Sequence, residues 1–169
     1  MMAASLACFA SFAAHAELRP ESVHAAQPKK SGTYVLDGVI TGGDQAVNDV
    51  VVRDIRRASN AGFERIVVDL EATRGGEPVA IQRPPYYQVS VNPDERRLVF
   101  TVWGRPKLDF DAKRVLKAFR KSQVIQKIEL LPSLEPDTWS FVAELKNGSP
   151  VEVFELSNPL RVIVDIRNK

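Results

Sequence analysis

One short pattern occurs twice in this chain: a β-rich segment, an Asn-Pro turn, and an arginine that enters a second β-rich segment. The first copy spans residues 86–102 with its turn at Asn92-Pro93, and the second spans residues 152–166 with its turn at Asn158-Pro159. Proline presets the backbone angle of a tight turn, and the preceding asparagine can hydrogen-bond the turn backbone. Repetition on this scale predicts a fold that is built from two similar sheet units.

Each Asn-Pro hairpin is preceded by a further strand and, before that, by a helix. Alternating apolar residues predict strands over residues 63–70 and 139–146, and further strands are expected over 33–40 and 124–131. Apolar residues four apart predict a helix over 44–60 and a second one from Asp109 or Asp111 to Lys121. The predicted fold class is mainly β with two helices (α+β): two small pseudo-symmetric antiparallel sheets, packed face to face, from a duplicated three-stranded meander.

The N-terminal segment has the composition of a secretory signal. Residues 1–16 contain no Lys, Arg, Asp or Glu and end in Ala14-His15-Ala16, so a signal peptide over 1–16 and an exported, periplasmic protein are expected. No basic residue precedes the apolar run, which a start codon assigned too late would explain. Residues 17–31 are polar and aperiodic and are expected to form a disordered tether before a single domain over 32–169. No later apolar run predicts a transmembrane span.

The single cysteine, Cys8, lies inside the expected signal. The residues before it loosely resemble a lipoprotein processing site, but Leu6 is one place too close to the cysteine and apolar residues continue to Ala16. Cleavage after Ala16 is therefore preferred over lipid anchoring at Cys8. The exported chain would then contain no cysteine and no disulfide.

The expected domain has few side chains for catalysis or metal binding. The two histidines, His15 and His24, precede it, so neither a Ser-His or Cys-His pair nor an ordinary zinc site is available within it. The glycine pairs 42–43 and 75–76 lack the spacing of nucleotide-binding motifs. We expect no cofactor, no metal and no enzymatic activity, although a carboxylate pair for glycoside hydrolysis stays open because Asp and Glu are plentiful.

The segment 157–166 resembles the second-hairpin signature of the AMIN domain, a non-catalytic module found beside cell-wall amidases and in pilus secretins. Residues 63–70 are similar to the opening strand of that family, and residues 97–104 to the close of its first half. The resemblance implies two small symmetric sheets, peptidoglycan binding and a place in the cell envelope. No amidase or secretin domain is attached, so the chain acts alone or localises an envelope enzyme or secretin-type protein. The alternative is a periplasmic protein–protein adaptor for a pilus or secretion complex, without direct glycan binding.

Seven residues near the two hairpins could contact peptidoglycan. Arginine pairs with stem-peptide carboxylates through two parallel hydrogen bonds, amide side chains add polar contacts, and aromatic rings stack on sugar rings. The alternative interpretations are purely structural: cross-strand ion pairs with Asp69 or Asp165, turn formation by the asparagines, and burial of the aromatic rings. Neighbouring strand residues alternate faces, so one of the two tyrosines must point inward. The candidates are Arg97, Arg161, Asn92, Asn158, Tyr86, Tyr87 and Trp103.

The second predicted helix has one basic face, formed by Lys113, Lys117, Arg120 and Lys121. Such a face is either ordinary solvated surface or a site that attracts anionic glycan strands, teichoic-type polymers or a membrane surface. The formal net charge of the whole chain is only +2. Nucleic acid is not an expected partner, because the protein is expected to be exported and no aromatic residues alternate with the basic ones.

Overall fold

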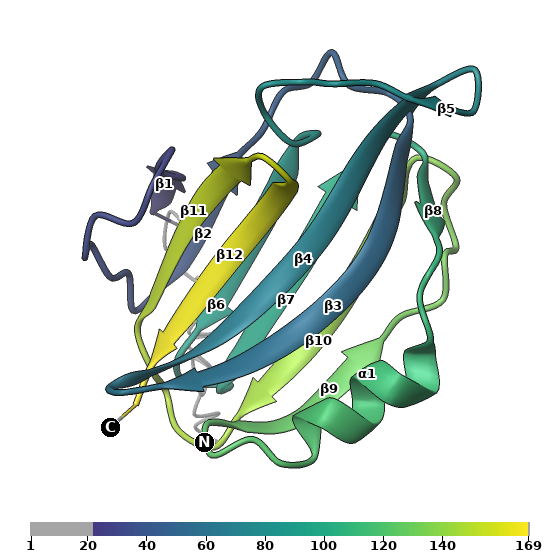
Figure 1. Cartoon of the computed structure of the whole chain (residues 1–169). Coiled ribbons are helices and arrows are strands. Elements are labelled where there is room, and N and C mark those ends of the chain that lie inside the picture. The colour runs from purple at the N-terminus through teal and green to yellow at the C-terminus, as the bar shows by residue number, and fades with distance from the viewer. Residues whose placement is uncertain (1–21, 169) are drawn as a thin grey trace, which may run out of the picture.

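The computed structural model describes residues 22–168, in which two β-sheets pack face to face (Figure 1). The expected signal over 1–16 and Cys8 lie outside the described residues. Sheet I has the strand order β1 (Val23–Ala25), β2 (Gly38–Gly42), β6 (Tyr87–Asn92), β7 (Arg97–Trp103), β10 (Thr138–Leu145) and β9 (Ile125–Leu130). Sheet II has the order β11 (Val151–Ser157), β12 (Leu160–Arg167), β4 (Phe63–Arg74), β3 (Val50–Asn60) and β8 (Pro106–Leu108), with β5 (Glu77–Pro78) paired to β4.

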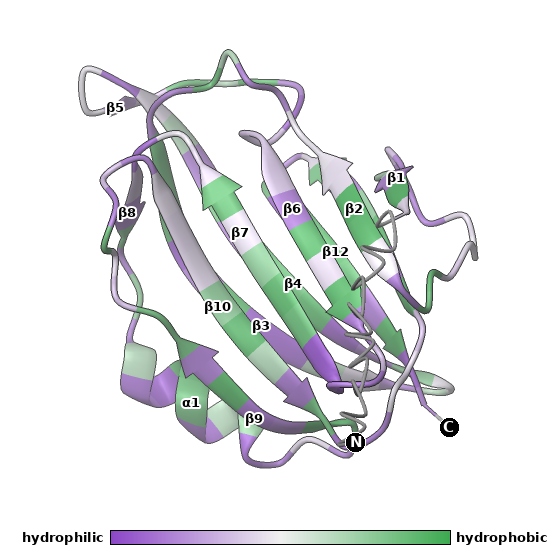
Figure 2. Ribbon diagram, turned by 180° about the vertical axis from the view of Figure 1, so that it is seen from behind, coloured by the Kyte–Doolittle hydropathy of each residue, from purple (hydrophilic) through white to green (hydrophobic). Residues whose placement is uncertain are grey.

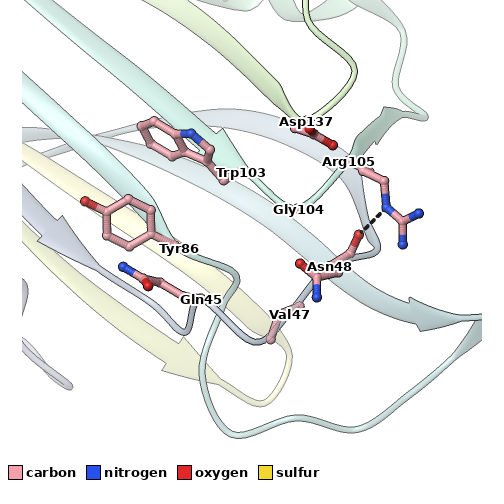
Figure 3. A pocket seen from close by; sticks show the side chains of 8 residues that line it. All are labelled: Gln45, Val47, Asn48, Tyr86, Trp103, Gly104, Arg105 and Asp137. Carbon is pink, nitrogen blue, oxygen red and sulfur yellow. Dashed lines mark hydrogen bonds between the residues drawn. The ribbon is translucent and has the colours of Figure 1, made fainter.

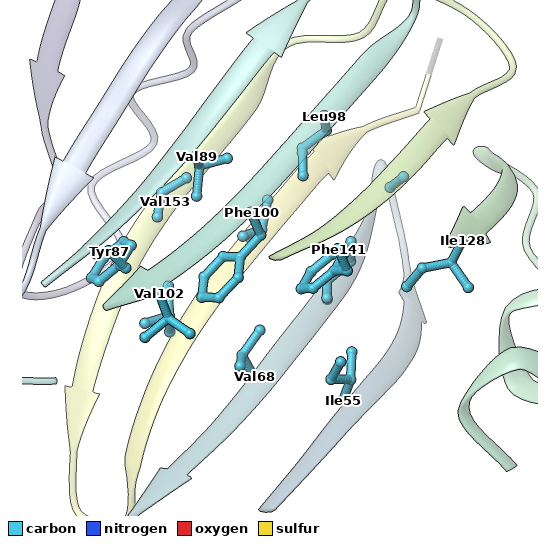
Figure 4. Packing of buried hydrophobic residues seen from close by; sticks show 14 of the residues in the cluster. Ile55, Val68, Tyr87, Val89, Leu98, Phe100, Val102, Ile128, Phe141 and Val153 are labelled. Carbon is cyan, nitrogen blue, oxygen red and sulfur yellow. The ribbon is translucent and has the colours of Figure 1, made fainter. Parts of the chain in front are cut away.

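One apolar core fills the space between the sheets. The rings of Tyr87, Phe100 and Phe141 form a row on the inner side of sheet I, with centroids 6.0 and 5.1 Å apart. Val68 and Ile55 of sheet II belong to the same buried cluster (Figure 4). Burying one such large side chain stabilises a fold by about 1.5–3 kcal/mol, so this layer is the main source of stability.

Two segments close the open sides of the sandwich. Helix α1 (Ala112–Phe119) contacts β3 of one sheet and β9 of the other, and Val115 and Phe119 are buried there. Asp111 caps the helix by accepting hydrogen bonds from two backbone N–H groups of the first turn. This confirms the helix expected up to residue 121. No helix within residues 22–168 is long and apolar enough to cross a bilayer.

The other open side is covered by residues 22–36. Strand β1 pairs in parallel with β2 of sheet I, while Gln27 and Val35 form bridges to β11 of sheet II. Backbone N–H groups of Ser31 and Gly32 donate to the buried Glu152 carboxylate at 2.6 and 2.7 Å. Residues 22–31 are therefore an attached part of the fold, and the expected disordered tether is wrong for them.

The two Asn-Pro hairpins, β6–β7 and β11–β12, form as predicted, and each lies in its own sheet. The predicted contiguous meander does not form. Strand β4 precedes the first hairpin but pairs with β12 of the second, whereas β10 precedes the second hairpin but pairs with β7 of the first. After β5 has paired with β4, the segment 79–86, which contains Pro84 and Pro85, carries the chain to β6 of the opposite sheet. The two sheets thereby share one antiparallel order, β6–β7–β10–β9 and β11–β12–β4–β3.

The helix predicted over 44–60 is wrong, because residues 50–60 form strand β3. A register shift between Val52 and Asp54 places an extra residue in the strand, so the side chains of the core cluster are Val50, Val52 and Ile55. Val51 and Ile55, whose four-residue spacing indicated one helical face, do not share a face: Ile55 belongs to the core cluster and Val51 does not. Helix α1 is thus the single helix of the described region, where the sequence predicts two.

Candidate functional site

The outer face of sheet I is made by the alternate residues of its three central strands. In β7, Leu98, Phe100 and Val102 are fully buried in the core, which directs the intervening side chains outward. The same alternation holds in β6 and, except for Val142, which is also buried, in β10. The outer side chains therefore form rows that run across the three strands, and Figure 2 shows this sheet from outside.

Four such rows follow from the strand register. The first contains Tyr86, Trp103 and Thr138, since the Trp103 N–H donates to the Tyr86 carbonyl and Trp103 is opposite Thr138. The next two rows carry no charge, and the last is charged or amidic. In order, these three rows are Gln88–Thr101–Ser140, Ser90–Val99–Val142 and Asn92–Arg97–Glu144.

An aromatic pair and a pocket lie at the first row. The ring centroids of Tyr86 and Trp103 are 5.0 Å apart and the ring planes are inclined by 49°. Both residues are partly exposed and line a cavity of about 650 Å³, a size suited to a small ligand (Figure 3). The cavity is also lined by Gln45, Val47, Asn48, Gly104, Arg105 and Asp137.

Two glycines let the loops around this pocket approach each other. Gly104 has a φ of +96°, and a Cβ there would lie 2.6 Å from the Val47 carbonyl oxygen. Gly43 has a φ of +84°, and its Cβ would lie 2.2 Å from the Pro85 carbonyl oxygen. Only glycine fits both requirements at low cost. The pocket walls are thus set by close backbone contacts.

The pocket includes residues that the sequence interpretation missed. Gln45 and Asn48 lie in the segment that was predicted to be helical, and Asp137 is held beside Gly104 by a 3.1 Å hydrogen bond from the Gly104 N–H to its carbonyl. No motif links residues 104 and 137 in the sequence. Strands over the first hairpin and over residues 139–146 were predicted from the sequence. The direct pairing of β7 with β10 was not predicted.

Tyr87 is not a ligand-binding residue. It is fully buried, and its hydroxyl donates to the Glu155 carboxylate at 3.2 Å. Burial, followed by the negative charge of Glu155, raises the pKa of Tyr87 far above its ordinary value. Arg83 also donates to this carboxylate, at 2.9 and 3.1 Å. The structure therefore assigns Tyr86 to the open face and Tyr87 to the core, in agreement with the expected alternation.

The two candidate arginines do not share a surface. Arg97 lies on the outer face of sheet I, is about half exposed, and has its nearest ionic contact at 3.7 Å to Glu95. Arg161 lies on the outer face of sheet II, directly opposite Asp69 in the strand register and 3.5 Å from its carboxylate. The structural interpretation, a cross-strand ion pair with Asp69, is confirmed for Arg161. A single surface that presents both arginines is ruled out by this placement.

The two asparagines also differ. The Asn92 side chain accepts a 3.0 Å hydrogen bond from the Glu95 N–H and so stabilises the first turn. Asn158 is exposed in the short turn between β11 and β12. The turn-forming role predicted for asparagine is therefore confirmed at Asn92.

The basic residues predicted on the second helix are exposed at α1 and just past its end: Lys113, Lys117, Arg120 and Lys121. Leu116 lies among them and is 36% exposed. The neighbouring Arg114 instead donates to Asp54 of β3 at 2.5 Å and ties the helix to sheet II.

The outer face of sheet II is occupied by ion pairs. Arg56 donates twice to Asp69, at 2.6 and 2.8 Å, and Arg65 donates twice to the fully buried Asp165, at 2.6 and 2.8 Å. These charge-assisted hydrogen bonds raise the pKa of both arginines. Lys30 of the N-terminal segment reaches Asp165 at 2.8 Å. Most charged groups of this face are therefore paired with one another, while Arg161 Nε and Glu152 Oε2 are buried without a hydrogen-bond partner among the described residues.

Three or more His, Cys, Asp or Glu side chains do not gather into a metal site anywhere in residues 22–168. A search of curated proteins finds no relative that matches this chain. A family model described as the AMIN-like domain matches residues 50–168, which covers both Asn-Pro hairpins and most of the two sheets. The chain therefore belongs to the AMIN-like domain family.

Proposed function

We propose that this protein is an exported, non-enzymatic component of the cell envelope that binds peptidoglycan through the outer face of sheet I. Membership of the AMIN-like family supports a peptidoglycan-binding role. The observation that carries the choice of surface is the row pattern of sheet I. An aromatic pair stands at one end, one polar row and one row with two valines follow, both uncharged, and Arg97 stands at the other end.

Each part of this surface suits one part of the polymer. Tyr86 and Trp103 offer ring faces for the C–H patches of sugars, and both carry a polar group at the ring edge. Gln88, Thr101 and Ser140 offer hydroxyl and amide groups for sugar hydroxyls and N-acetyl groups. Thr101 and Ser140 are already hydrogen-bonded to each other at 2.8 Å, so both are held in one orientation.

The spacing of the two ends fits a polymeric ligand. Trp103 and Arg97 are six residues apart on one strand, which corresponds to about 20 Å at the rise of an extended chain. A glycan strand stacked on the aromatic end would cross the uncharged rows, and a stem-peptide carboxylate would meet Arg97. The partly exposed guanidinium keeps donors available for such a carboxylate.

Co-sedimentation of the purified protein with isolated sacculi tests this proposal. We expect the protein in the pellet at low salt, and recovery in the supernatant under those conditions would overturn it. Incubation with muropeptides, analysed by mass spectrometry, should give no new product. A cleaved product would overturn the non-enzymatic part.

The second candidate function is an adaptor that docks a pilus or secretion component without binding glycan. The observation in its favour is the exposed Leu116 within the basic face of α1, because an apolar side chain ringed by cations suits a protein partner. Crosslinking in cells separates the two functions. A discrete protein partner together with no retention on sacculi would favour the adaptor.

A further inference from the structure

We propose that the pocket beside Trp103 binds a primary ammonium group of the ligand. This inference rests on the proposed function, because it names the chemical group that the aromatic end of sheet I selects. Two parts of peptidoglycan carry such a group: a glucosamine unit that lacks its acetyl group, and the free side-chain amine of a diamino acid in the stem peptide. Both would present a cation to the same wall of the pocket.

The aromatic wall attracts cations. Tyr86 and Trp103 line the pocket with rings inclined by 49° and centroids 5.0 Å apart, so they form an open corner (Figure 3). The negative face of an aromatic ring attracts an ammonium group placed within about 6 Å of its centroid, and tryptophan does so most strongly. Sugar stacking uses the same rings, so an amino sugar would satisfy both interactions.

Asp137 supplies a negative charge to this pocket. Its side chain is exposed, and among residues 22–168 no cationic side chain pairs with it. The nearby Arg105 is already engaged, since it donates to the Asn48 carbonyl at 2.9 Å and to Asp49 at 3.0 Å. The charge of Arg105 is thus offset by Asp49, and the pocket retains the charge of Asp137. A cationic ligand is favoured over an anionic one for this reason.

The pocket is preorganised for such a ligand. Backbone hydrogen bonds join Trp103 to Tyr86 at 3.0 Å and Gly104 to Asp137 at 3.1 Å, so the aromatic corner and the backbone of Asp137 are held on adjacent chain segments. Gly104 lets the loop carrying Val47 close the third side. Little ordering is then needed on binding, which favours affinity. The amide side chains of Gln45 and Asn48 lie on the rim for sugar hydroxyls.

Titration calorimetry of the full chain with matched probes tests the inference. One pair is a tetramer of β-1,4-linked glucosamine and its fully N-acetylated counterpart. The other is a muropeptide with a free diamino-acid amine and the same muropeptide with that amine acetylated. We expect about tenfold tighter binding of the free amine in at least one pair, and the pair that shows it identifies the source of the ammonium group.

The variant Asp137→Asn separates charge from shape. We expect it to remove the preference for the free amine while leaving affinity for the acetylated probes unchanged. The matched control is Asp94→Asn, because Asp94 is exposed in the β6–β7 turn at the opposite end of sheet I and changes the net charge equally. That control should retain the preference. Thermal unfolding should show both variants folded as the parent.

Equal affinities within both probe pairs, or an unchanged preference in Asp137→Asn, would overturn the ammonium site. Retention on sacculi without amine preference would overturn this inference alone and leave the proposed function standing. Tight amine binding without retention on sacculi would support the pocket and overturn the proposed function. Binding to neither sacculi nor any probe would overturn both.

Discussion

Sheet I and sheet II share one four-strand order, yet their outer faces differ in chemistry. On sheet I the two middle rows are uncharged and the aromatic row opens into a pocket. On sheet II, Asp69 and Asp165 each contact two cationic side chains: Arg56 and Arg161 at Asp69, and Arg65 and Lys30 at Asp165. One face carries two uncharged rows and a pocket, while the other carries internal ion pairs.

The comparison shows that a duplicated strand order does not duplicate a binding surface. Arg97 and Arg161 follow equivalent turns, and each is opposite a carboxylate on the neighbouring strand, Glu144 or Asp69. The difference comes from the next strand: β3 brings Arg56 to Asp69, whereas β9 brings Lys127 to within 4.0 Å of Glu144. Flanking residues therefore decide how closely the carboxylate opposite each arginine is paired.

The largest expected effect is on stability, at the face that holds ion pairs. Asp165→Ala should lower the free energy of unfolding by about 3 kcal/mol, because Arg65 and Lys30 lose a fully buried partner. Urea denaturation measures this loss. The control on sheet I is Glu144→Ala, which should cost less than about 1 kcal/mol because its ionic contact is long and exposed. Equal losses of unfolding free energy in the two variants would contradict the stated difference between the two faces.

The next effect is on binding, at the aromatic end of sheet I. Trp103→Ala should weaken retention on sacculi by about thirtyfold, which corresponds to roughly 2 kcal/mol for a lost aromatic contact. Sedimentation at a series of sacculus concentrations gives the affinity. Unfolding should change little, because Trp103 is partly exposed outside the core. Unaltered retention would move the binding surface away from sheet I.

A direct contrast comes from the two equivalent arginines. Arg97→Ala should reduce sacculus affinity about tenfold, the effect of losing one charge-assisted interaction of about 1.4 kcal/mol. Arg161→Ala should leave affinity unchanged, since its guanidinium is directed at Asp69 on the opposite side of the molecule. The same sedimentation assay compares them. A larger loss for Arg161→Ala would reverse the assignment of the faces.

The smallest expected effect is on the pH dependence of stability, and it comes from Tyr87, which points inward from β6. The pKa of Tyr87 is raised in the folded state, so its stabilising contribution is complete below pH 10 and is lost as the pH rises above 10. Between pH 9.5 and 10.5 this removes about 0.7 kcal/mol from the free energy of unfolding. Urea denaturation at both pH values should show a smaller decrease for Tyr87→Phe than for the parent. Identical decreases would contradict the burial of this phenol.

The hairpins and strands were predictable because their signals are local. Asn92-Pro93 and Asn158-Pro159 mark turns, and alternation over residues 63–70 matches β4. The helix predicted over 44–60 failed for an equally local reason. The extra residue after Val52 changes the spacing of core-facing side chains from two to three, and Gly62 takes a φ of +84° in the turn between β3 and β4.

The candidate site was only partly predictable. Alternation requires one of Tyr86 and Tyr87 to face inward, and the pairing of Tyr86 with Trp103 follows once the hairpin is placed. The rest of the pocket could not be predicted in this way, because Gln45 and Asp137 are brought beside Trp103 by contacts between distant loops. The exchange of strands between sheets, which separates Arg97 from Arg161, likewise depends on tertiary packing that leaves no periodic signal in the chain.

The position of β12 has a consequence for the order in which the protein folds. It is the last strand of the described region, yet it lies inside its sheet, between the edge strand β11 and β4. A growing polypeptide cannot complete that sheet until nearly the whole chain has been synthesised, and such non-local pairing folds slowly. A premature stop before Leu160 would leave β4 without this neighbour. The pairing of β12 with β4 is therefore a late step in the formation of sheet II.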